Sequence, residues 1–230
     1  MLTRTTLRKT PTGEDLARDA QFGSRLAANP LKGSIELMGA PMRFARNEEI
    51  YGESEPADYI YKLVGGTVRT YRVLSDGRRQ IGAFYLPGDM FGLECGAEHS
   101  FSAEAITNAT VLVIKRSAVT ALASHDVSVA QQLLAMTAQE LARVQVHLML
   151  LIKTAQERVA DFLLEMAERA DGHNEVDLPM SRQDIADYLG LTIETISRTL
   201  TQLESSAAIA LPTSRRIVLR NRAALRQLNS

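Results

Sequence analysis

The sequence is poor in the residues that build covalent and metal-centred sites. Its 230 residues include one cysteine, Cys95, and no tryptophan. A single cysteine excludes an internal disulfide and any cluster held by several thiolates of one chain. Two interpretations of Cys95 stay open: a small, partly buried side chain, or a redox-sensing thiol. The second requires an exposed setting that lowers the thiol pKa.

Long apolar runs and an excess of charge are also missing. No apolar run reaches the roughly 18 residues that span a bilayer, and the start of the chain lacks the apolar core of a signal peptide. We therefore expect a cytoplasmic protein with no membrane partner. The formal net charge is −1, so the whole molecule has no field that attracts polyanions. A charged binding surface must come from one segment.

Turn residues divide the chain into regions that differ in residue composition and pattern. From about residue 40 to 116, short runs of Ile, Val, Tyr and Phe are broken by Gly-Gly, Asp-Gly and Pro-Gly, a pattern typical of antiparallel strands rolled into a small sandwich or barrel. About 45 residues from Asp126 lack glycine and proline, which predicts helix with a break near Lys153–Thr154. The predicted regions are a loosely ordered arm (1–30), a strand-rich domain (31–125), a long helix (126–154) and a C-terminal helical domain (155–230).

The long helix carries an apolar seam of about two heptads. Its members are Leu134, Leu141, Val144, Leu148 and Leu151. The helix could pack on its own domain, or the seam could pair with a second copy of the chain. The second interpretation is favoured because the stretch "VHLMLLI" is too apolar to face water on a long helix.

The stretch "SRQDIADYLGLTIETISRTLTQLE" predicts a helix-turn-helix. Ser181 and Asp184 are suited to begin a short helix, because the serine oxygen accepts from a free backbone N–H and the acid favours the positive end of the helix dipole. Gly190 can adopt the backbone angles of a tight turn, and Thr192 can cap a second helix that starts at Ile193. Two helices joined by so short a turn form this motif.

The second helix of such a motif enters the major groove with its N-terminal part. At about 100° per residue, one face of its first turns presents Ile193, Glu194, Ser197 and Arg198. Arginine bonds guanine O6 and N7, glutamate accepts from cytosine N4, and serine or an aliphatic contact suits thymine. Glu194 and Arg198 could instead form a surface ion pair. The turn before them and the basic segment after them favour base reading.

That basic segment, residues 213–228, holds five arginines and no acid. From Ser181 onwards there are seven arginines against four acids, so the local charge is 7 − 4 = +3. Positive charge beside a recognition helix is what phosphate contact requires. The stretch "AIALPTSRRIVLR" predicts two short strands, which would add a wing to the motif.

Strand domain, long helix and winged motif together resemble the bacterial Crp/Fnr transcription regulators, over roughly residues 30–225. "DGRRQIGAFYLPGDMFG" is similar to the family's effector-domain stretch, and E-x-x-S-R at Glu194, Ser197 and Arg198 to the pattern of its Fnr and FixK branch. The resemblance implies an α+β fold. Its expected parts are an N-terminal antiparallel β-roll sensor domain like a cyclic-nucleotide-binding domain, a long dimerisation helix and a C-terminal winged helix-turn-helix.

The resemblance also implies a function. The chain would be a homodimeric activator that reads a TTGAT-N4-ATCAA palindrome and recruits RNA polymerase at genes for low-oxygen respiration or nitrogen fixation. Arg198 would meet guanine, Glu194 the opposite strand's cytosine, and Ser197 would lie near the outer thymine. The expected contacts to the DNA backbone are Ser181, Arg182, Gln183, Thr192, Thr195, Arg215 and Arg216.

The effector pocket departs from the family pattern. Cyclic-nucleotide binders of this fold hold the phosphate with an Arg-Ser/Thr-Ala run, and here that place reads Phe101-Ser102-Ala103. An aromatic ring cannot neutralise a phosphate, so we expect no binding of cyclic AMP. An effector-dependent regulator of the same fold and a repressor are the alternatives.

No cofactor or metal is expected. Fnr itself carries an iron–sulfur cluster on four cysteines, which one cysteine cannot supply. The histidines are scattered along the chain and are each expected to be surface or satisfied side chains: His99, His125, His147 and His173. The sequence has no Gly-rich phosphate loop and no nucleophile elbow, so an enzyme is not expected.

Overall fold

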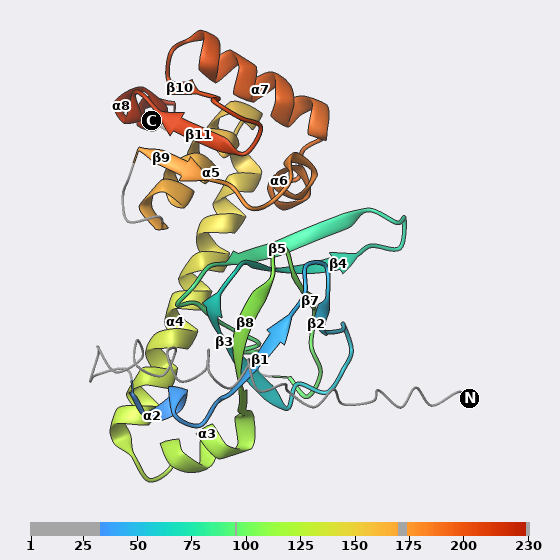
Figure 1. Ribbon diagram of the computed structural model, residues 1–230, viewed down its shortest axis with the longest axis vertical. Helices are drawn as coiled ribbons and strands as arrows, with labels where there is room; N and C mark the ends of the chain where they lie inside the picture. Colours follow the sequence, from blue (N-terminus) through green and yellow to red (C-terminus); the bar gives the residue numbers. More distant parts are fainter. Residues whose placement is uncertain (1–32, 95, 170–173, 229–230) are drawn as a thin grey trace, which may run out of the picture.

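The structure, a computed structural model, describes residues 33–94, 96–169 and 174–228 (Figure 1). The predicted arm, Cys95 and His173 lie outside the described residues. In chain order the elements are α2 (Gly33–Glu36), β1 (Ala40–Phe44), β2 (Glu49–Tyr51), β3 (Tyr59–Gly65), β4 (Val68–Val73), β5 (Arg79–Tyr85), β6 (Met90–Phe91), β7 (Ser102–Ala105), β8 (Ala109–Lys115), α3 (Arg116–Ala123), α4 (Val127–Met149), η1 (Leu150–Ile152), α5 (Ala155–Arg169), β9 (Glu175–Asp177), α6 (Arg182–Leu189), α7 (Ile193–Ser205), β10 (Ile209–Ala210), β11 (Arg216–Leu219) and α8 (Arg222–Gln227).

The strand-rich region forms a β-roll of two antiparallel sheets. One sheet has the strand order β1-β8-β3-β6, and the other has the order β2-β7-β4-β5. The Asp-Gly break, Asp76-Gly77, is the turn of a hairpin: β4 and β5 pair antiparallel from Val68↔Tyr85 to Val73↔Arg79. Gly77 has φ +83°, which the turn requires and a side chain would oppose. In Figure 1 this hairpin extends beneath the C-terminal domain.

The alternation of buried and exposed side chains along a half-buried strand is broken at the start of β4. Val68, Arg69 and Thr70 are all buried, although successive side chains of a strand point to opposite faces. Val68 faces the interior of the roll, whereas the side chain of Arg69 contacts α6 of the C-terminal domain. The C-terminal domain covers the outer face of the sheet here, so side chains on both faces of the start of β4 are buried.

The helical region begins earlier than the sequence indicated, because α3 precedes α4. Asp126 caps α4, accepting a hydrogen bond from the backbone N–H of Ser128 at 2.8 Å. One side of α4 packs on the β-roll, with Val129 fully buried. The break expected near Lys153–Thr154 is confirmed: α4 ends at Met149, the short 3-10 helix η1 follows, and α5 begins at Ala155.

The C-terminal domain packs α5, α6, α7 and a small sheet around one core. The apolar stripe predicted on α5 is buried: Val159, Phe162, Leu163 and Met166. The predicted strand pair is confirmed as β10 and β11, and a third strand, β9, pairs with β11. This strand lies in the stretch "EVD", which the sequence indicated as a connection. The core also includes Ile81 and Phe84 of the β-roll, so it is continuous between the two domains.

Candidate nucleic-acid interface

The first helix of the motif, α6, begins at a capping box, as predicted. Ser181 Oγ accepts from the backbone N–H of Asp184 at 3.1 Å, and Asp184 Oδ2 accepts from the backbone N–H of Ser181 at 2.9 Å. Burial raises the pKa of Asp184. The hydrogen bonds from Ser181 and the charges of Arg69 and Arg79 outweigh burial and hold this pKa below its ordinary value. The carboxylate is therefore ionised at neutral pH.

The turn between the helices depends on Gly190. Its backbone is left-handed, with φ +63° and ψ +39°, and the backbone N–H of Leu191 donates to Ala186 O at 3.0 Å. Arg158 of α5 donates from Nη1 to Leu189 O at 2.9 Å and from Nε to Lys153 O at 3.0 Å. Sequence reasoning missed Arg158, because its partner at the end of α6 is 31 residues away. This bond fixes the end of α6 on α5.

The second helix, α7, begins at Ile193 with Thr192 as its cap. The backbone N–H of Thr195 donates to Thr192 Oγ1 at 3.2 Å. One face of α7 is held in the core by Ile196, Leu200, and Leu203 further along. Anchoring along this face leaves the opposite face of the first turns towards solvent. In Figure 1, α7 lies on the side of the C-terminal domain away from α8.

The exposed face of α7 carries the predicted base-reading set. Ile193, Glu194 and Arg198 are exposed, and Ser197 is half-buried. Within residues 174–228, no ion pair joins Glu194 to Arg198. The structure therefore does not adopt the surface ion pair that was the alternative for these two residues. The backbone N–H of Glu194, the Thr192 hydroxyl and the nearby Arg198 charge lower the pKa of Glu194. At neutral pH this face therefore offers an acceptor and a guanidinium together.

Ser197 has a defined hydrogen-bonding role. Arg182 Nη1 donates to Ser197 Oγ at 3.3 Å. The half-buried Ser197 hydroxyl therefore accepts from a guanidinium, and a hydroxyl can also donate one hydrogen bond. Arg182, predicted from the resemblance to contact phosphate, thus lies against the recognition helix.

The remaining residues expected on the DNA backbone differ in their surroundings. Gln183 is exposed, and its Nε2 donates to Asp187 Oδ1 at 2.6 Å. Arg215 is exposed and has no ion pair within the described residues. Arg216 Nε lies 3.1 Å from the carboxylates of both Glu175 and Asp177 on β9, which offset its charge. The assignments to the DNA backbone stay predictions, and Arg215 is the wing arginine whose charge no acid of the described residues offsets.

Comparison with known proteins agrees with this geometry. Residues 157–228 match the model of a Crp-like helix-turn-helix domain, and residues 41–126 match that of a cyclic nucleotide-binding domain. The nitrogen fixation regulation protein FixK of Azorhizobium caulinodans is 52% identical over 202 residues, which cover 85% of this chain and 82% of that protein. The protein of the same description from Rhizobium meliloti is 44% identical over 210 residues, covering 87% and 96%.

This chain belongs to the Crp/Fnr family. The structure of FixK2 from Bradyrhizobium japonicum matches it with a TM-score of 0.80 and 53% identity, over 84% of this chain and 98% of that one. Because its relatives include several FixK proteins, the chain is a FixK-like transcription regulator with a helix-turn-helix. The expected α+β architecture of β-roll, helices and C-terminal helix-turn-helix is confirmed.

The β-roll of this Crp/Fnr member is filled by its own aromatic rings. Tyr61 lies 5.1 Å from the rings of both Tyr51 and Phe91, and Tyr85 also lies 5.1 Å from Phe91. His99 stacks on Tyr51 at 3.7 Å. Burial is the main cause that raises the pKa of Tyr51, and it raises that of Tyr61 to about 12. These phenols stay neutral and occupy the interior.

The resemblance places Phe101 at the position of the family's phosphate-binding arginine. Its ring lies so close to Gly82 that a Cβ added there would meet Cε1 at 3.1 Å. Outside the roll, a cavity of about 250 Å³ lies against α4. Its charged groups are already paired: Lys62 with Glu36, and Arg143 with Asp89 and Glu140.

The predicted seam of α4 faces solvent in this single chain. The exposed fractions are 70% for Leu134, 57% for Leu141, 58% for Val144 and 60% for Leu148. The side chain of Leu151 lies outside the described part of the structure. Within the described residues, nothing of the chain itself covers this seam. In the same part of the chain, no helix is both long and apolar enough to cross a bilayer.

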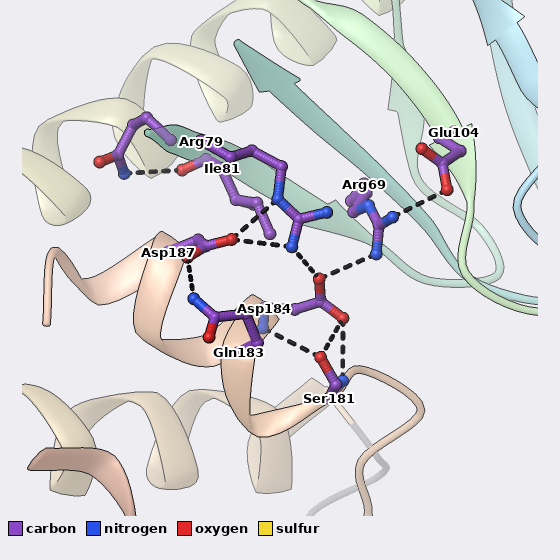
Figure 2. Close-up of polar contacts among 9 residues, drawn as sticks. Arg69, Arg79, Ile81, Glu104, Ser181, Gln183, Asp184 and Asp187 are labelled. Carbon is purple, nitrogen blue, oxygen red and sulfur yellow. Dashed lines mark hydrogen bonds and ion pairs between the residues drawn. The ribbon is translucent and has the colours of Figure 1, made fainter. Parts of the chain in front are cut away.

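Charged residues outside the motif connect the β-roll to α6, and sequence reasoning did not single them out: Arg69, Arg79 and Glu104. Figure 2 shows Arg69 and Arg79 reaching from the hairpin β4–β5 to Asp184 and Asp187 of α6, with Glu104 behind Arg69. Asp184 was interpreted only as a helix-start residue. The pairs are separated by more than 100 residues, so no local pattern indicates them.

Proposed function

We propose that this FixK-like regulator is a homodimeric transcription activator that reads a TTGAT-N4-ATCAA palindrome. The observation that carries the proposal is the exposed face of α7, where Glu194 and Arg198 have no ion pair to each other within the described residues and Ser197 lies on the same face. Arginine to guanine and glutamate to cytosine N4 are direct readouts of one base pair from its two strands. Ser197 then meets an acceptor such as thymine O4.

The seam of α4 supports a homodimer. A row of exposed leucine and valine side chains on one side of a helix is unfavourable in water, and a second copy of the same helix buries it. A symmetric dimer would place two copies of α7 in successive major grooves, roughly 34 Å apart. Such spacing matches the palindrome.

Activity without a bound effector is supported by the filled β-roll and by Phe101. Binding a nucleotide inside the roll would require displacing several packed rings, and the resemblance places the aromatic Phe101 where cyclic-nucleotide binders carry an arginine. The named relatives regulate nitrogen fixation, so the proposed targets are genes for nitrogen fixation or low-oxygen respiration. The regulator would act there by recruiting RNA polymerase.

Replacement of Arg198 by alanine tests base reading. We expect Arg198→Ala to lose roughly 1–3 kcal/mol of preference for the palindrome over a duplex in which the guanine is replaced, because the bidentate contact disappears. Fluorescence anisotropy with both duplexes at one fixed salt concentration measures this. Arg226→Ala is the matched control, since it removes the same charge from α8, where Arg226 pairs loosely with Glu168. Equal preferences in Arg198→Ala and wild type contradict the assignment.

A glutamate in the seam tests the dimer. We expect Leu141→Glu to sediment as a single chain and to lose tight binding to the full palindrome, because two buried carboxylates would face each other. Val146→Glu is the control: Val146 is 63% exposed and, at about 100° per residue, lies about 140° around the helix from Leu141. If both variants dissociate into single chains, the dimer contact is not specific to the seam.

In vitro transcription separates the proposed activator from the two alternatives. Purified protein and RNA polymerase are combined on a promoter that carries the palindrome, with and without cyclic AMP. We expect more transcript with protein alone and no change on adding the nucleotide. Dependence on the nucleotide supports the effector-dependent regulator, and a fall in transcript supports the repressor.

A further inference from the structure

A buried ionic cluster joins the β-roll to the first helix of the DNA-binding motif (Figure 2). Arg69 Nη1 lies 2.8 Å from Asp184 Oδ1, and Arg79 Nη2 lies 2.6 Å from the same oxygen. Arg79 also bonds Asp187 Oδ2, from Nε at 2.8 Å and from Nη2 at 2.7 Å. On its far side, Arg69 is held by Glu104 Oε1 at 2.8 Å. We call these five residues the interdomain cluster.

The interdomain cluster is buried at its centre, whereas the side chains of Arg79 and Asp187 keep 25% and 12% of their exposure. Arg69 is 8% exposed and Asp184 is 4% exposed. Each arginine carbon Cζ also lies 5.9 Å from the centroid of the Tyr71 ring, which restricts the guanidinium groups further. Removing one member of a buried ion pair leaves an uncompensated charge and is costly. The two domains therefore separate at this contact only at a substantial cost in free energy.

Apolar contacts reinforce the same junction. The rings of Phe84 on β5 and Tyr188 on α6 lie 5.1 Å apart, and both belong to the core cluster shared by the two domains. Gln80 Nε2 lies 3.4 Å from Tyr188 O and 3.0 Å from Ile81 O. The hairpin thus meets α6 through charged, aromatic and backbone contacts together.

The two carboxylate oxygens of Asp184 have different hydrogen-bond partners. Oδ2 accepts from the backbone N–H and the hydroxyl of Ser181, which begins α6. Oδ1 receives both guanidinium groups of the β-roll. One carboxylate therefore sets where α6 starts and also how α6 is oriented on the β-roll. Since α7 follows α6 after a tight turn at Gly190, that orientation extends to the recognition helix.

We propose that Arg69 and Arg79 are positioning residues for DNA recognition. They contact no base or phosphate. By holding Asp184 and Asp187, they fix the tilt of α6 and α7 relative to the β-roll, and in the dimer they thereby set the distance between the two recognition helices. This inference rests on the proposed function, because it concerns how two half-sites of a palindrome are met at once.

Spacer length in the DNA is the readout that distinguishes positioning from base reading. Full-length wild type, Arg79→Gln, Asp187→Asn and the double variant are titrated with palindromes of the predicted spacer and of spacers one and two base pairs longer. A duplex with a single half-site is included. Arg78→Gln is the matched control, because Arg78 lies next to Arg79 but pairs only with Asp76 of its own turn within the described residues.

We expect wild type and Arg78→Gln to prefer the predicted spacer. In Arg79→Gln and in Asp187→Asn this preference should fall about tenfold, in the range of an ordinary coupling between sites, with affinity for the single half-site unchanged within about twofold. The double variant should lose little more than Arg79→Gln alone, because Asp187→Asn removes only a contact that Arg79→Gln has already removed. Arg79→Lys keeps the charge but not the bidentate contact, so its spacer preference should lie between those of wild type and Arg79→Gln.

Two results overturn the proposal. One is an unchanged spacer preference in folded Arg79→Gln and Asp187→Asn. The other is an equal loss of affinity for every duplex, the single half-site included, which indicates a role in folding alone. If Arg79→Gln does not fold by circular dichroism, Arg79→Lys and Asp187→Asn decide between these outcomes. Failure of the proposed function looks different: wild type itself would not distinguish the palindrome from scrambled DNA.

Discussion

The interior of the β-roll and the outer face of α7 use polar groups in opposite ways. Inside the roll, Tyr51, Tyr61 and His99 face other rings and fill the space. On α7, Glu194 and Arg198 face solvent and have no ion pair to each other within the described residues. The contrast teaches that polar groups inside the roll are packed against rings of the same chain, whereas those on the exposed face of α7 stay accessible to a second molecule.

The largest expected effect comes from opening the roll. Phe91 is 1% exposed and touches three tyrosine rings, so Phe91→Ala should lower the free energy of unfolding by about 3–5 kcal/mol. The ratio of affinities for palindrome and scrambled DNA should stay that of wild type below the unfolding transition. Urea unfolding and anisotropy measure the two quantities. Phe101→Ala, at a partly buried ring, should cost less stability.

The converse change on α7 should alter specificity and leave stability intact. Glu194→Gln keeps the shape but adds donors, and glutamine pairs with adenine N6 and N7. We expect roughly 1–3 kcal/mol less discrimination between cytosine and adenine at the contacted position, and an unfolding free energy within about 0.5 kcal/mol of wild type. Gln202→Ala, an exposed position further along α7, serves as control. A large fall in stability would place Glu194 among the structural residues.

The smallest expected effect is on the pH dependence of the free energy of unfolding, through a histidine at the contact between α4 and α6. Burial, followed by the charge of Arg158, lowers the pKa of His147, whose ring lies 4.4 Å from that of Tyr188. The unfolded chain therefore takes up the proton first, and stability falls as the pH drops below about 6.5. Urea midpoints above and below that pH should show this loss in wild type and less of it in His147→Phe. His125→Gln, at an exposed histidine, should behave as wild type.

Asp184 acts in a different pH window. Its folded pKa lies below the ordinary value, so its contribution to stability is present above about pH 3.9 and is lost as the pH falls through the folded pKa. Asp184 is thus charged where His147 titrates. We therefore expect a loss of stability between neutral pH and about pH 5 to come from His147 and not from Asp184.

The helix-turn-helix could be predicted residue by residue because its signals are local. A cap oxygen and the backbone N–H that donates to it are three residues apart at Ser181 and again at Thr192, and Gly190 supplies the left-handed turn between them. Strand β9 could not be predicted in the same way. Its partner β11 lies about forty residues further on, as in the register Val176↔Ile217, and a strand this short has no period to detect.

The sequence by itself determined the two-domain order, the long helix with its seam and the face of α7 that carries Glu194, Ser197 and Arg198. Periodicity, capping and turn residues act over a few residues, so they can be recognised in the chain alone. Only the tertiary structure decided that Arg69 and Arg79 meet Asp184 and Asp187, and that aromatic rings close the β-roll. Those contacts join residues distant in the chain, because burial is a property of the packed molecule and not of any one segment.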